Sequence, residues 1–203
     1  EIVEKERKRI ARDLHDTVSQ EIFAAHMILS GLSQQASKLD RVKMQTQLQS
    51  VTAILETAQR DLRILLLHLR PIELEQKSLV EGIQLLLKEL EEKSELKVSF
   101  KYEIDELPKK IEEHIFRIVQ ELISNTLRHA QASCLDVYLY QTETGLQLKV
   151  VDNGRGFQLD DVDELSHGLR NIKERVEDMA GSIQLLTAPK QGLAVDIRIP
   201  LLD

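Results

Sequence analysis

The chain has 203 residues, of which 42% are hydrophobic, 30% are charged and 3% are aromatic. This composition is typical of a folded, helix-rich protein, and the length suits one large domain or two small ones. The formal net charge of −7 argues against nucleic acid as a direct partner, because binding to phosphates relies on an excess of Lys and Arg. The single cysteine, Cys134, can form no disulfide within the chain, and we expect a small core residue there.

Two features bear on membranes. No apolar run approaches the roughly 20 residues that span a bilayer. The sequence also begins without Met, inside a predicted helix. We therefore expect a fragment whose preceding part holds any membrane segment.

Two long amphipathic helices are predicted in the first third of the chain. In residues 1–36 apolar side chains recur every three or four positions, which places them on one helix face; they are Ile10, Leu14, Val18, Ile22, Ala25, Leu29 and Leu32. The polar stretch 33–40 is predicted to be a turn. Residues 42–70 show the alternation of a coiled-coil seam, in Leu48, Val51, Leu55, Ala58, Leu62, Leu65 and Leu69.

The two helices are expected to form an antiparallel hairpin, because their connection is short. Ile54, Leu66 and Leu67 widen the apolar stripe of the second helix beyond what one partner helix can cover. Two copies of the hairpin would bury this surface in a four-helix bundle. The sequence thus predicts a homodimer formed through residues 1–70.

A second domain is predicted after Pro71, which ends the second helix because its ring removes a backbone donor. We place the boundary near residues 71–77, giving domains 1–72 and 73–203. Helices are predicted at 79–93, 108–128 and 168–180, and strands at 96–104, 134–141, 146–151, 182–187 and 193–199. Helices and strands that do not alternate strictly indicate an α+β fold, here a two-layer sandwich.

Four short motifs contain residue types that can carry chemistry, and the first is His15-Asp16. His15 adjoins the apolar stripe, and a neutral imidazole can attack a phosphoryl group if a neighbour such as Asp16 takes its proton. Asp16 and Gln20 are four residues apart, so they share a helix face and could orient a water molecule. Taken alone, these positions are better explained as ordinary surface side chains.

The second motif lies on the helix predicted at 108–128. Glu121, Asn125 and the pair Arg128-His129 follow at i, i+4 and i+7/i+8, so they would share one face. An amide oxygen such as that of Asn125 is a suitable ligand for a Mg²⁺ ion that bridges phosphates. A polar outer helix face is the alternative.

The third and fourth motifs contain glycines beside predicted strands and helices. Asp152 ends a strand and precedes Gly154 and Gly156, which let a ligand approach the backbone closely. The Asp152 carboxylate could accept a hydrogen bond from an amine such as that of adenine. His167-Gly168-Leu169 opens a helix, where backbone N–H groups can bind phosphate. A plain turn and a simple helix start are the alternatives.

In this order and spacing the motifs resemble those of sensor histidine kinases that pair with NarL/LuxR-type response regulators. Within that family the chain is similar to the cell-envelope-stress kinases of the VraS/LiaS kind. The resemblance is carried by RDLHDTVSQ (residues 12–20), LLLHLRPI (65–72) and ISNTLRH (123–129).

The resemblance implies an ATP-dependent autokinase with a GHKL-type nucleotide domain. His15 would be the phospho-acceptor, Asp16 the general base, and Gln20 with Asp16 a phosphatase pair. Glu121 would be catalytic, and Asn125 would bind Mg²⁺. The other positions implied to bind ATP are Arg128, His129, Asp152, Gly154, Gly156, His167, Gly168, Leu169 and Gly192.

The implied partners are a second copy of the chain and a response regulator with a receiver domain and a LuxR-type DNA-binding domain. The chain would be the cytoplasmic portion of a bacterial membrane protein, attached to the membrane only through its missing N-terminal part.

One position departs from the family pattern, because Leu193 follows Gly192 where the family usually has Thr. The lost hydroxyl removes one possible hydrogen bond, worth about 0.5–1.5 kcal/mol. Two alternatives stay open. One is a GHKL ATPase or protein-serine kinase that does not use His15, and the other is a scaffold with an inactive pocket.

Overall fold

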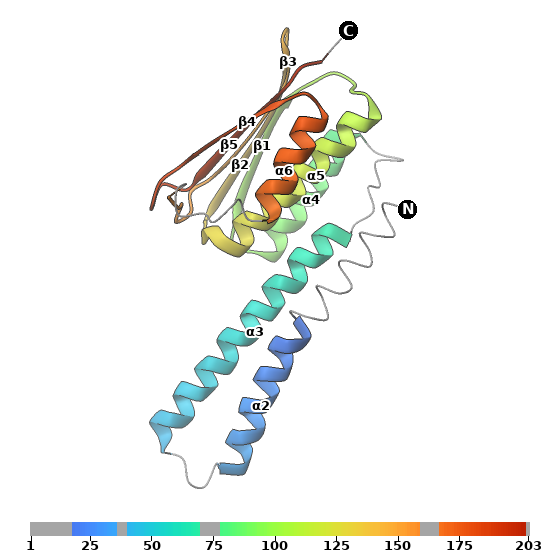
Figure 1. Ribbon diagram of the computed structural model, residues 1–203. Coiled ribbons are helices and arrows are strands. Elements are labelled where there is room, and N and C mark those ends of the chain that lie inside the picture. Colours follow the sequence, from blue (N-terminus) through green and yellow to red (C-terminus); the bar gives the residue numbers. More distant parts are fainter. Residues whose placement is uncertain (1–17, 36–39, 70–77, 159–166, 202–203) are drawn as a thin grey trace. The chain divides into compact units, whose positions relative to one another are not determined.

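The structure, a computed structural model, describes residues 18–35, 40–69, 78–158 and 167–201 (Figure 1). The chain divides into two compact units, Glu1–Arg70 and Pro71–Asp203. None of the helices in the described ranges is both long and apolar enough to cross a membrane.

The first unit contains the predicted antiparallel hairpin, formed by α2 (Ser19–Gln35) and α3 (Arg41–Leu69) (Figure 1). Asp40 caps α3, since its Oδ1 accepts a hydrogen bond of 2.8 Å from the backbone N–H of Lys43. The turn predicted at 33–40 is wrong at its start, because α2 continues through residues 33–35. Ser33 and Gln34 are exposed there, and polar side chains are tolerated on the outer side of a helix.

The apolar residues of the hairpin form two rows. Five buried residues recur every seven positions along each segment: Val18, directly before α2, Ala25 and Leu32 of α2, and Val51 and Ala58 of α3. A second set, which we call the outer row, is between 39% and 53% exposed; it comprises Ile22, Leu29, Leu48, Leu55 and Leu62. Each member lies four residues after a buried residue of the first row, except Leu48, which lies four residues after Met44. A step of four residues is a rotation of about 40° around the helix axis. Contacts between α2 and α3 therefore bury only one edge of the apolar stripe, and the outer row stays partly exposed.

The second unit is a two-layer sandwich of one five-stranded sheet and three helices, which lie on one face of the sheet (Figure 1). The helices are α4 (Leu79–Lys93), α5 (Lys109–Asn125) and α6 (His167–Asp178). The strands are β1 (Lys97–Glu103), β2 (Cys134–Thr142), β3 (Gly145–Asp152), β4 (Ser182–Thr187) and β5 (Leu193–Ile199). Their order is β1-β2-β3-β5-β4, with β1 and β2 parallel and every other pair antiparallel.

The core of this unit lies between the sheet and α5. Alternate residues of the central strands are buried, as half-covered strands require; they include Leu135, Val137, Leu139, Leu148, Val150 and Ile197. On α5 the buried side chains recur at helical spacing and include Ile115, Ile118, Val119, Leu122 and Ile123. This packing fixes α5 against the sheet, so the C-terminal end of the helix lies near the end of β3.

The helix predicted at 108–128 has a different ending. It is α-helical only to Asn125 and continues as a five-residue π-helix, Thr126–Ala130. Gln131 then takes a left-handed conformation with φ of 52°. π-helical turns are rare and are frequent at functional sites.

Candidate functional site

Asp152, the last residue of β3, is a buried carboxylate with 5% of its surface exposed. Its Oδ1 accepts a hydrogen bond of 2.8 Å from the backbone N–H of Gly154. Burial raises the pKa of Asp152 above its ordinary value, while hydrogen bonding by the backbone N–H groups of Gly154 and Leu193 and by Thr126 lowers it. A carboxylate offers about four acceptor positions, so positions beyond the one that Gly154 uses can accept from a ligand amine.

Glu121 and Asn125, one turn apart on α5, lie directly against the start of α6. A Cβ atom added to Gly168 would be 2.2 Å from Glu121 Oε1 and 3.0 Å from Asn125 Oδ1. Only glycine leaves room for both side chains here. The predicted second and fourth motifs are thus brought together, beside a helix start that favours bound anions.

Asn125 also carries an unsatisfied polar atom. Its Nδ2 is buried and has no hydrogen-bond partner. A buried donor left unpaired costs about 1–3 kcal/mol, and a polar ligand at Gly168 would provide an acceptor. The residues at this position therefore fit a phosphate-bearing ligand.

The glycine-bearing loop after Asp152 is held against two other segments. Arg155 N–H donates to the carbonyl of Ala130 at 2.7 Å, and a Cβ on Gly154 would lie 2.3 Å from that same oxygen. A Cβ on Gly156, which has φ of 57°, would lie 2.0 Å from the carbonyl of Ala188. The loop therefore joins the end of the π-helix to the turn between β4 and β5.

Gly192, directly before β5, lies against the end of β3. Its φ is 72°, and an added Cβ would lie 2.0 Å from the carbonyl oxygen of Asp152. Both the backbone conformation and the close approach require glycine. The three predicted glycine motifs thus all meet Asp152 or the α5 side chains.

Three residues of the site region escaped the sequence analysis. Thr187 Oγ1 donates to the carbonyl of Gly192 at 2.7 Å and accepts from the N–H of Phe157 at 3.2 Å. Asn153 Oδ1 accepts from the N–H groups that begin β2, each at 2.9 Å. The third is Thr126, which is buried and whose hydroxyl donates to the carbonyl of Leu122 at 3.1 Å. Only their proximity to the motifs in the sequence, one residue away for Asn153 and Thr126, could have indicated them.

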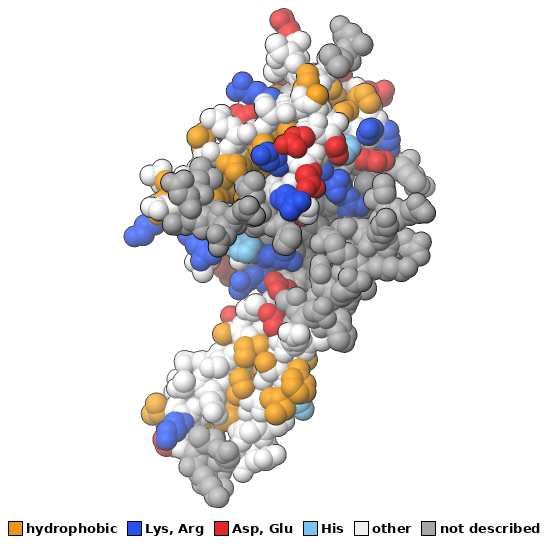
Figure 2. Space-filling view, in the orientation of Figure 1, with side chains coloured by type: hydrophobic (Ala, Val, Ile, Leu, Met, Phe, Trp, Pro, Cys, Tyr) orange, Lys and Arg blue, Asp and Glu red, His pale blue; other side chains and the backbone are white. Residues whose placement is uncertain are grey.

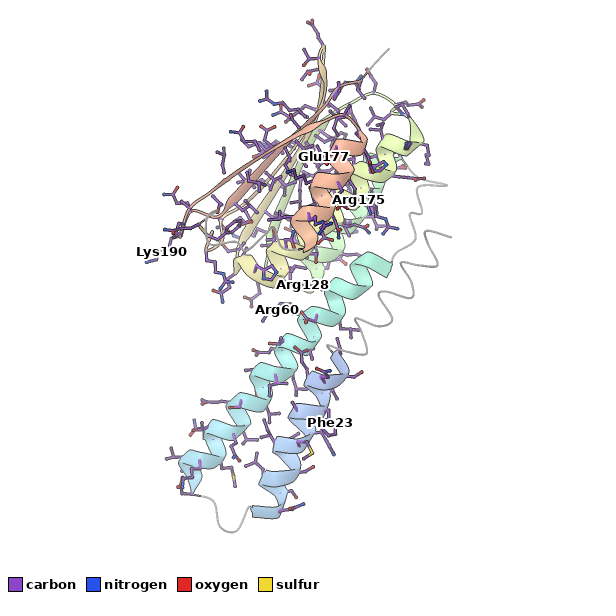
Figure 3. The ribbon with its side chains drawn as sticks, in the orientation of Figure 1. Phe23, Arg60, Arg128, Arg175, Glu177 and Lys190 are labelled. Atoms are coloured by element: carbon purple, nitrogen blue, oxygen red, sulfur yellow. The ribbon has the colours of Figure 1, made fainter. Side chains whose placement is uncertain are left out.

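The remaining predicted ATP-binding residues lie in the π-helix and at the start of α6. Arg128 (Figure 3) and His129 lie in the π-helix and are exposed. Because a π-helix bonds i to i+5, their angular spacing from Glu121 differs from that of an α-helix. His167 is the first residue of α6, and Leu169 is buried at 7% exposure, so Leu169 can present only its backbone to a ligand.

Of the three site residues predicted in the hairpin, the structure describes one. Gln20 is exposed near the start of α2. His15 and Asp16 lie outside the described residues.

A metal ion would find few protein ligands. Within the ranges that the structure describes, no group of three or more His, Cys, Asp and Glu side chains is placed to hold one. Mg²⁺ often keeps its waters and takes one or two protein ligands together with substrate phosphates. The amide oxygen of Asn125 is suited to that mode.

Comparison with known families agrees with this site. Residues 6–74 match the family described as histidine kinase, and residues 110–203 match the family of histidine kinase-, DNA gyrase B-, and HSP90-like ATPases. With both parts present in this order, the chain belongs to the sensor histidine kinases, and the resemblance inferred from the motifs is confirmed.

Individual relatives show to which sensor histidine kinases the chain is similar. The chain is 42% identical to sensor protein VraS of Staphylococcus saprophyticus over 200 residues, which is 98% of this chain and 57% of that protein. Sensor protein VraS of Staphylococcus aureus is 40% identical over 200 residues, again 98% of this chain and 57% of that protein. The chain thus spans little more than half the length of these relatives.

Solved structures confirm the predicted fold class. The histidine kinase domain of the Erythrobacter litoralis blue-light activated histidine kinase has a TM-score of 0.53 at 18% identity, with 98% of this chain and 94% of that chain covered. Acinetobacter baumannii histidine kinase AdeS has a TM-score of 0.51 at 19% identity, with 93% and 98% covered. At these identities the likeness concerns the fold alone.

Proposed function

We propose that this chain is the catalytic core of a two-component sensor kinase, which phosphorylates itself on His15 with ATP. Residues 73–203 would form the ATP-binding domain, and residues 1–72 would form the hairpin for dimerisation and phosphotransfer. The observation that carries the proposal is the contact of Gly168 with Glu121 and Asn125, because it assembles a phosphate site from segments more than forty residues apart.

In the nucleotide site each residue has a distinct role. Asp152 accepts a hydrogen bond from the adenine amine, and the backbone N–H groups near Gly168 face the phosphates. Gly154, Gly156 and Gly192 allow the close approach. Asn125 would hold Mg²⁺, and Glu121 beside it would accept hydrogen bonds from water on the ion; when bound, the ion would supply positive charge against the phosphates.

Further positions follow from the family motifs. Arg128 and His129 of the π-helix would bind the phosphates, as would His167 and Leu169, which flank Gly168 at the start of α6.

In the hairpin, His15 is the nucleophile and Asp16 takes its second ring proton. A nitrogen–phosphorus bond forms as the bond between the γ-phosphorus and its bridging oxygen breaks, leaving ADP. The phosphoryl group then passes to an aspartate of a response regulator. Asp16 and Gln20 orient a water molecule that removes the phosphoryl group from that regulator. The exposure of Gln20 on α2 supports access by a partner.

The proposed partners follow from the family and from the exposed apolar surface. A second copy of the chain would cover the outer row. Figure 2 shows hydrophobic side chains gathered on the hairpin. The regulator has a receiver domain and a LuxR-type DNA-binding domain, so this chain itself contacts no nucleic acid.

The motif resemblance further suggests a response to cell-envelope stress. The chain would lie on the cytoplasmic side of a bacterial membrane, with the anchor in the part of the protein that precedes it.

The test is incubation of the purified chain with γ-labelled ATP and Mg²⁺, in parallel with His15→Ala. We expect acid-labile, alkali-stable label on the wild type and none on the variant. Label that resists acid and is lost in alkali would indicate a serine kinase, and label that persists in His15→Gln would exclude His15 as the acceptor. Failure to bind nucleotide would leave an inactive scaffold.

A further inference from the structure

We infer that Thr187 is a positioning residue for the adenine side of the nucleotide site: its hydroxyl joins the start of β5 to the glycine-bearing loop that follows Asp152. The inference rests on the proposed function, since it assumes that Asp152 and this loop bind adenine. Thr187 is the last residue of β4 and belongs to none of the motifs that identified the site. The hydrogen bonds of its hydroxyl and its place in the sheet carry the inference.

The register of the sheet places Thr187 in one row with Asp152. Thr187 pairs directly with Leu193 of β5, and Leu193 pairs directly with Asp152 of β3. Side chains of directly opposed residues project from the same face of a sheet, so these three share one face. Leu193, in the middle, has an aliphatic side chain that can neither donate nor accept a hydrogen bond. The hydroxyl in this row therefore belongs to Thr187.

The Thr187 hydroxyl makes hydrogen bonds to two segments of the backbone. Its Oγ1 donates to the carbonyl of Gly192 at 2.7 Å and accepts from the backbone N–H of Phe157 at 3.2 Å. The carbonyl of Phe157, at 3.5 Å, is the more distant acceptor, so we assign the hydroxyl proton to Gly192. A hydroxyl both donates and accepts, so one side chain joins the residue before β5 to the glycine-bearing loop.

Both of these backbone segments lie against the position proposed for adenine. A Cβ added to Gly192 would overlap the carbonyl oxygen of Asp152, and one added to Gly156 would lie 2.9 Å from the carbonyl oxygen of Gly192. The oxygen that accepts from Thr187 is therefore close to the glycine-bearing loop, and the residue that carries it packs on Asp152. A shift of Gly192 would displace both neighbours.

The turn between β4 and β5 needs support because two of its residues have left-handed backbone conformations. φ is 66° at Lys190 and 72° at Gly192, and such values are unfavourable for a residue with a side chain, as Lys190 has. Lys190 N–H donates to the carbonyl of Arg155 at 2.5 Å. That bond joins backbone groups and persists when a side chain is changed. The bonds of Thr187 depend on one hydroxyl, so a single substitution removes them.

Loss of this hydroxyl should weaken binding of the base and leave the phosphate contacts unchanged. The proposed phosphate site consists of Glu121 and Asn125 of α5 and Gly168 of α6. Thr187 instead acts on the β4–β5 turn and the glycine-bearing loop. ATP and ADP contain the same base, so both should lose affinity by the same factor, and phosphoryl transfer from bound ATP should keep its rate.

The experiment measures binding of ATP and ADP, each with Mg²⁺, by calorimetry on the full chain. Thr187→Val keeps the side-chain shape and removes the hydroxyl, and Thr187→Ser keeps the hydroxyl. We expect Thr187→Val to weaken both nucleotides about tenfold and Thr187→Ser to bind them nearly as the wild type does. In autophosphorylation, KM for ATP should rise while kcat stays nearly unchanged, as expected for a contact that binds ground state and transition state equally.

Thr142→Val is the matched control. Thr142 is the last residue of β2, and its hydroxyl also donates to a glycine carbonyl across a strand turn, that of Gly145 at 3.0 Å. It lies at the opposite end of β3 from Asp152. Thr142→Val should therefore lower Tm about as much as Thr187→Val does and leave nucleotide affinity unchanged, which separates positioning from a general loss of stability.

Wild-type affinity in Thr187→Val would overturn the inference. A loss for ATP that ADP does not share would also overturn it, and so would a Thr187→Ser variant as weak as Thr187→Val, because the hydroxyl would then not be what holds the loop. If the Val variant does not fold, Thr187→Ala removes the same hydroxyl, and wild-type affinity there is equally decisive. A wild-type chain that binds no nucleotide would instead overturn the proposed function.

Discussion

At the scale of single residues, Gly168 is the most informative position to change. In Gly168→Ala the new methyl group would meet only the ends of flexible side chains, Glu121 Oε1 at 2.2 Å and Asn125 Oδ1 at 3.0 Å. Those side chains can move, so the fold should survive. They would move away from the positions proposed for Mg²⁺ and phosphate. We expect ATP affinity to fall at least about tenfold, or 1.4 kcal/mol, with Tm within about 3 °C of the wild type.

Two other glycines provide contrasts for this measurement. In Gly154→Ala the methyl group would meet backbone at Ala130 O, 2.3 Å away, so that variant should lose stability as well as binding. Gly31→Ala has nothing within 4 Å and lies inside α2. It should keep ATP affinity and stabilise the hairpin by about 0.5–1 kcal/mol. Unchanged ATP affinity in Gly168→Ala would contradict the proposed phosphate site.

The spacing of residues along the sequence predicted the part of the site that lies within one helix. It did not predict contacts between residues that are far apart in the sequence. Glu121 and Asn125 are one helical turn apart, so their proximity follows from the period of a helix. Thr126 is buried because α5 packs across the sheet and ends in a π-helical turn. No local pattern encodes that turn, and the pairing of Thr187 with Gly192 likewise depends on the β4–β5 register.

At the scale of elements, the α2–α3 hairpin contains a carboxyl group in an unfavourable place. Glu21 Oε2 is buried without a hydrogen-bond partner. Burial raises the pKa of Glu21 above its ordinary value near 4.5, Asp61 raises it further, and Arg60 lowers it. A carboxyl whose folded pKa is raised binds protons more readily in the folded state. Its ionisation therefore destabilises the hairpin as pH rises through the folded pKa.

Glu21→Gln removes this charge and should stabilise the hairpin at neutral pH. Because Glu21 is partly exposed, solvent screens the effect, and we expect Tm to rise by only about 1–2 °C near pH 7.5. Near pH 3, well below the ordinary pKa of a Glu carboxyl, residue 21 is uncharged in both proteins, and they should melt together. The measurement is thermal unfolding by circular dichroism at both pH values. Glu56→Gln, an exposed position on α3, should shift Tm at neither pH; an equal shift in both variants would show that only net charge matters.

The bounds of most elements were predictable, for a reason visible at Ser78 and Pro108. Ser78 and Glu81 form a capping box at the start of α4, and Pro108 precedes α5. Such signals are local, as is the alternation of the strands. Ser33 and Gln34 gave a wrong prediction because exposed polar side chains occur in both helices and turns; tertiary contact between α2 and α3 decides which one forms.

At the scale of the whole molecule, the outer row of the hairpin is an apolar surface that a single chain leaves partly exposed. Its five aliphatic side chains are between 39% and 53% exposed, on helices whose buried row is already covered. Phe23 is 64% exposed and points away from α3 (Figure 3), so it lies outside that row. A second hairpin packed on the outer row would bury all five side chains in a four-helix bundle.

Leu55→Glu tests the proposed homodimer, because Leu55 lies mid-way along α3 in the outer row and is 40% exposed. Burying one leucine stabilises by about 1.5–3 kcal/mol, and a symmetric dimer contains two copies. The variant should therefore weaken self-association at least about a hundredfold, which sedimentation velocity over a concentration series would detect. Gln49→Glu adds the same charge at an exposed position of α3 outside the outer row and should remain dimeric. If both variants dimerise like the wild type, the outer row faces something other than a second copy, and the bundle must form through a different surface.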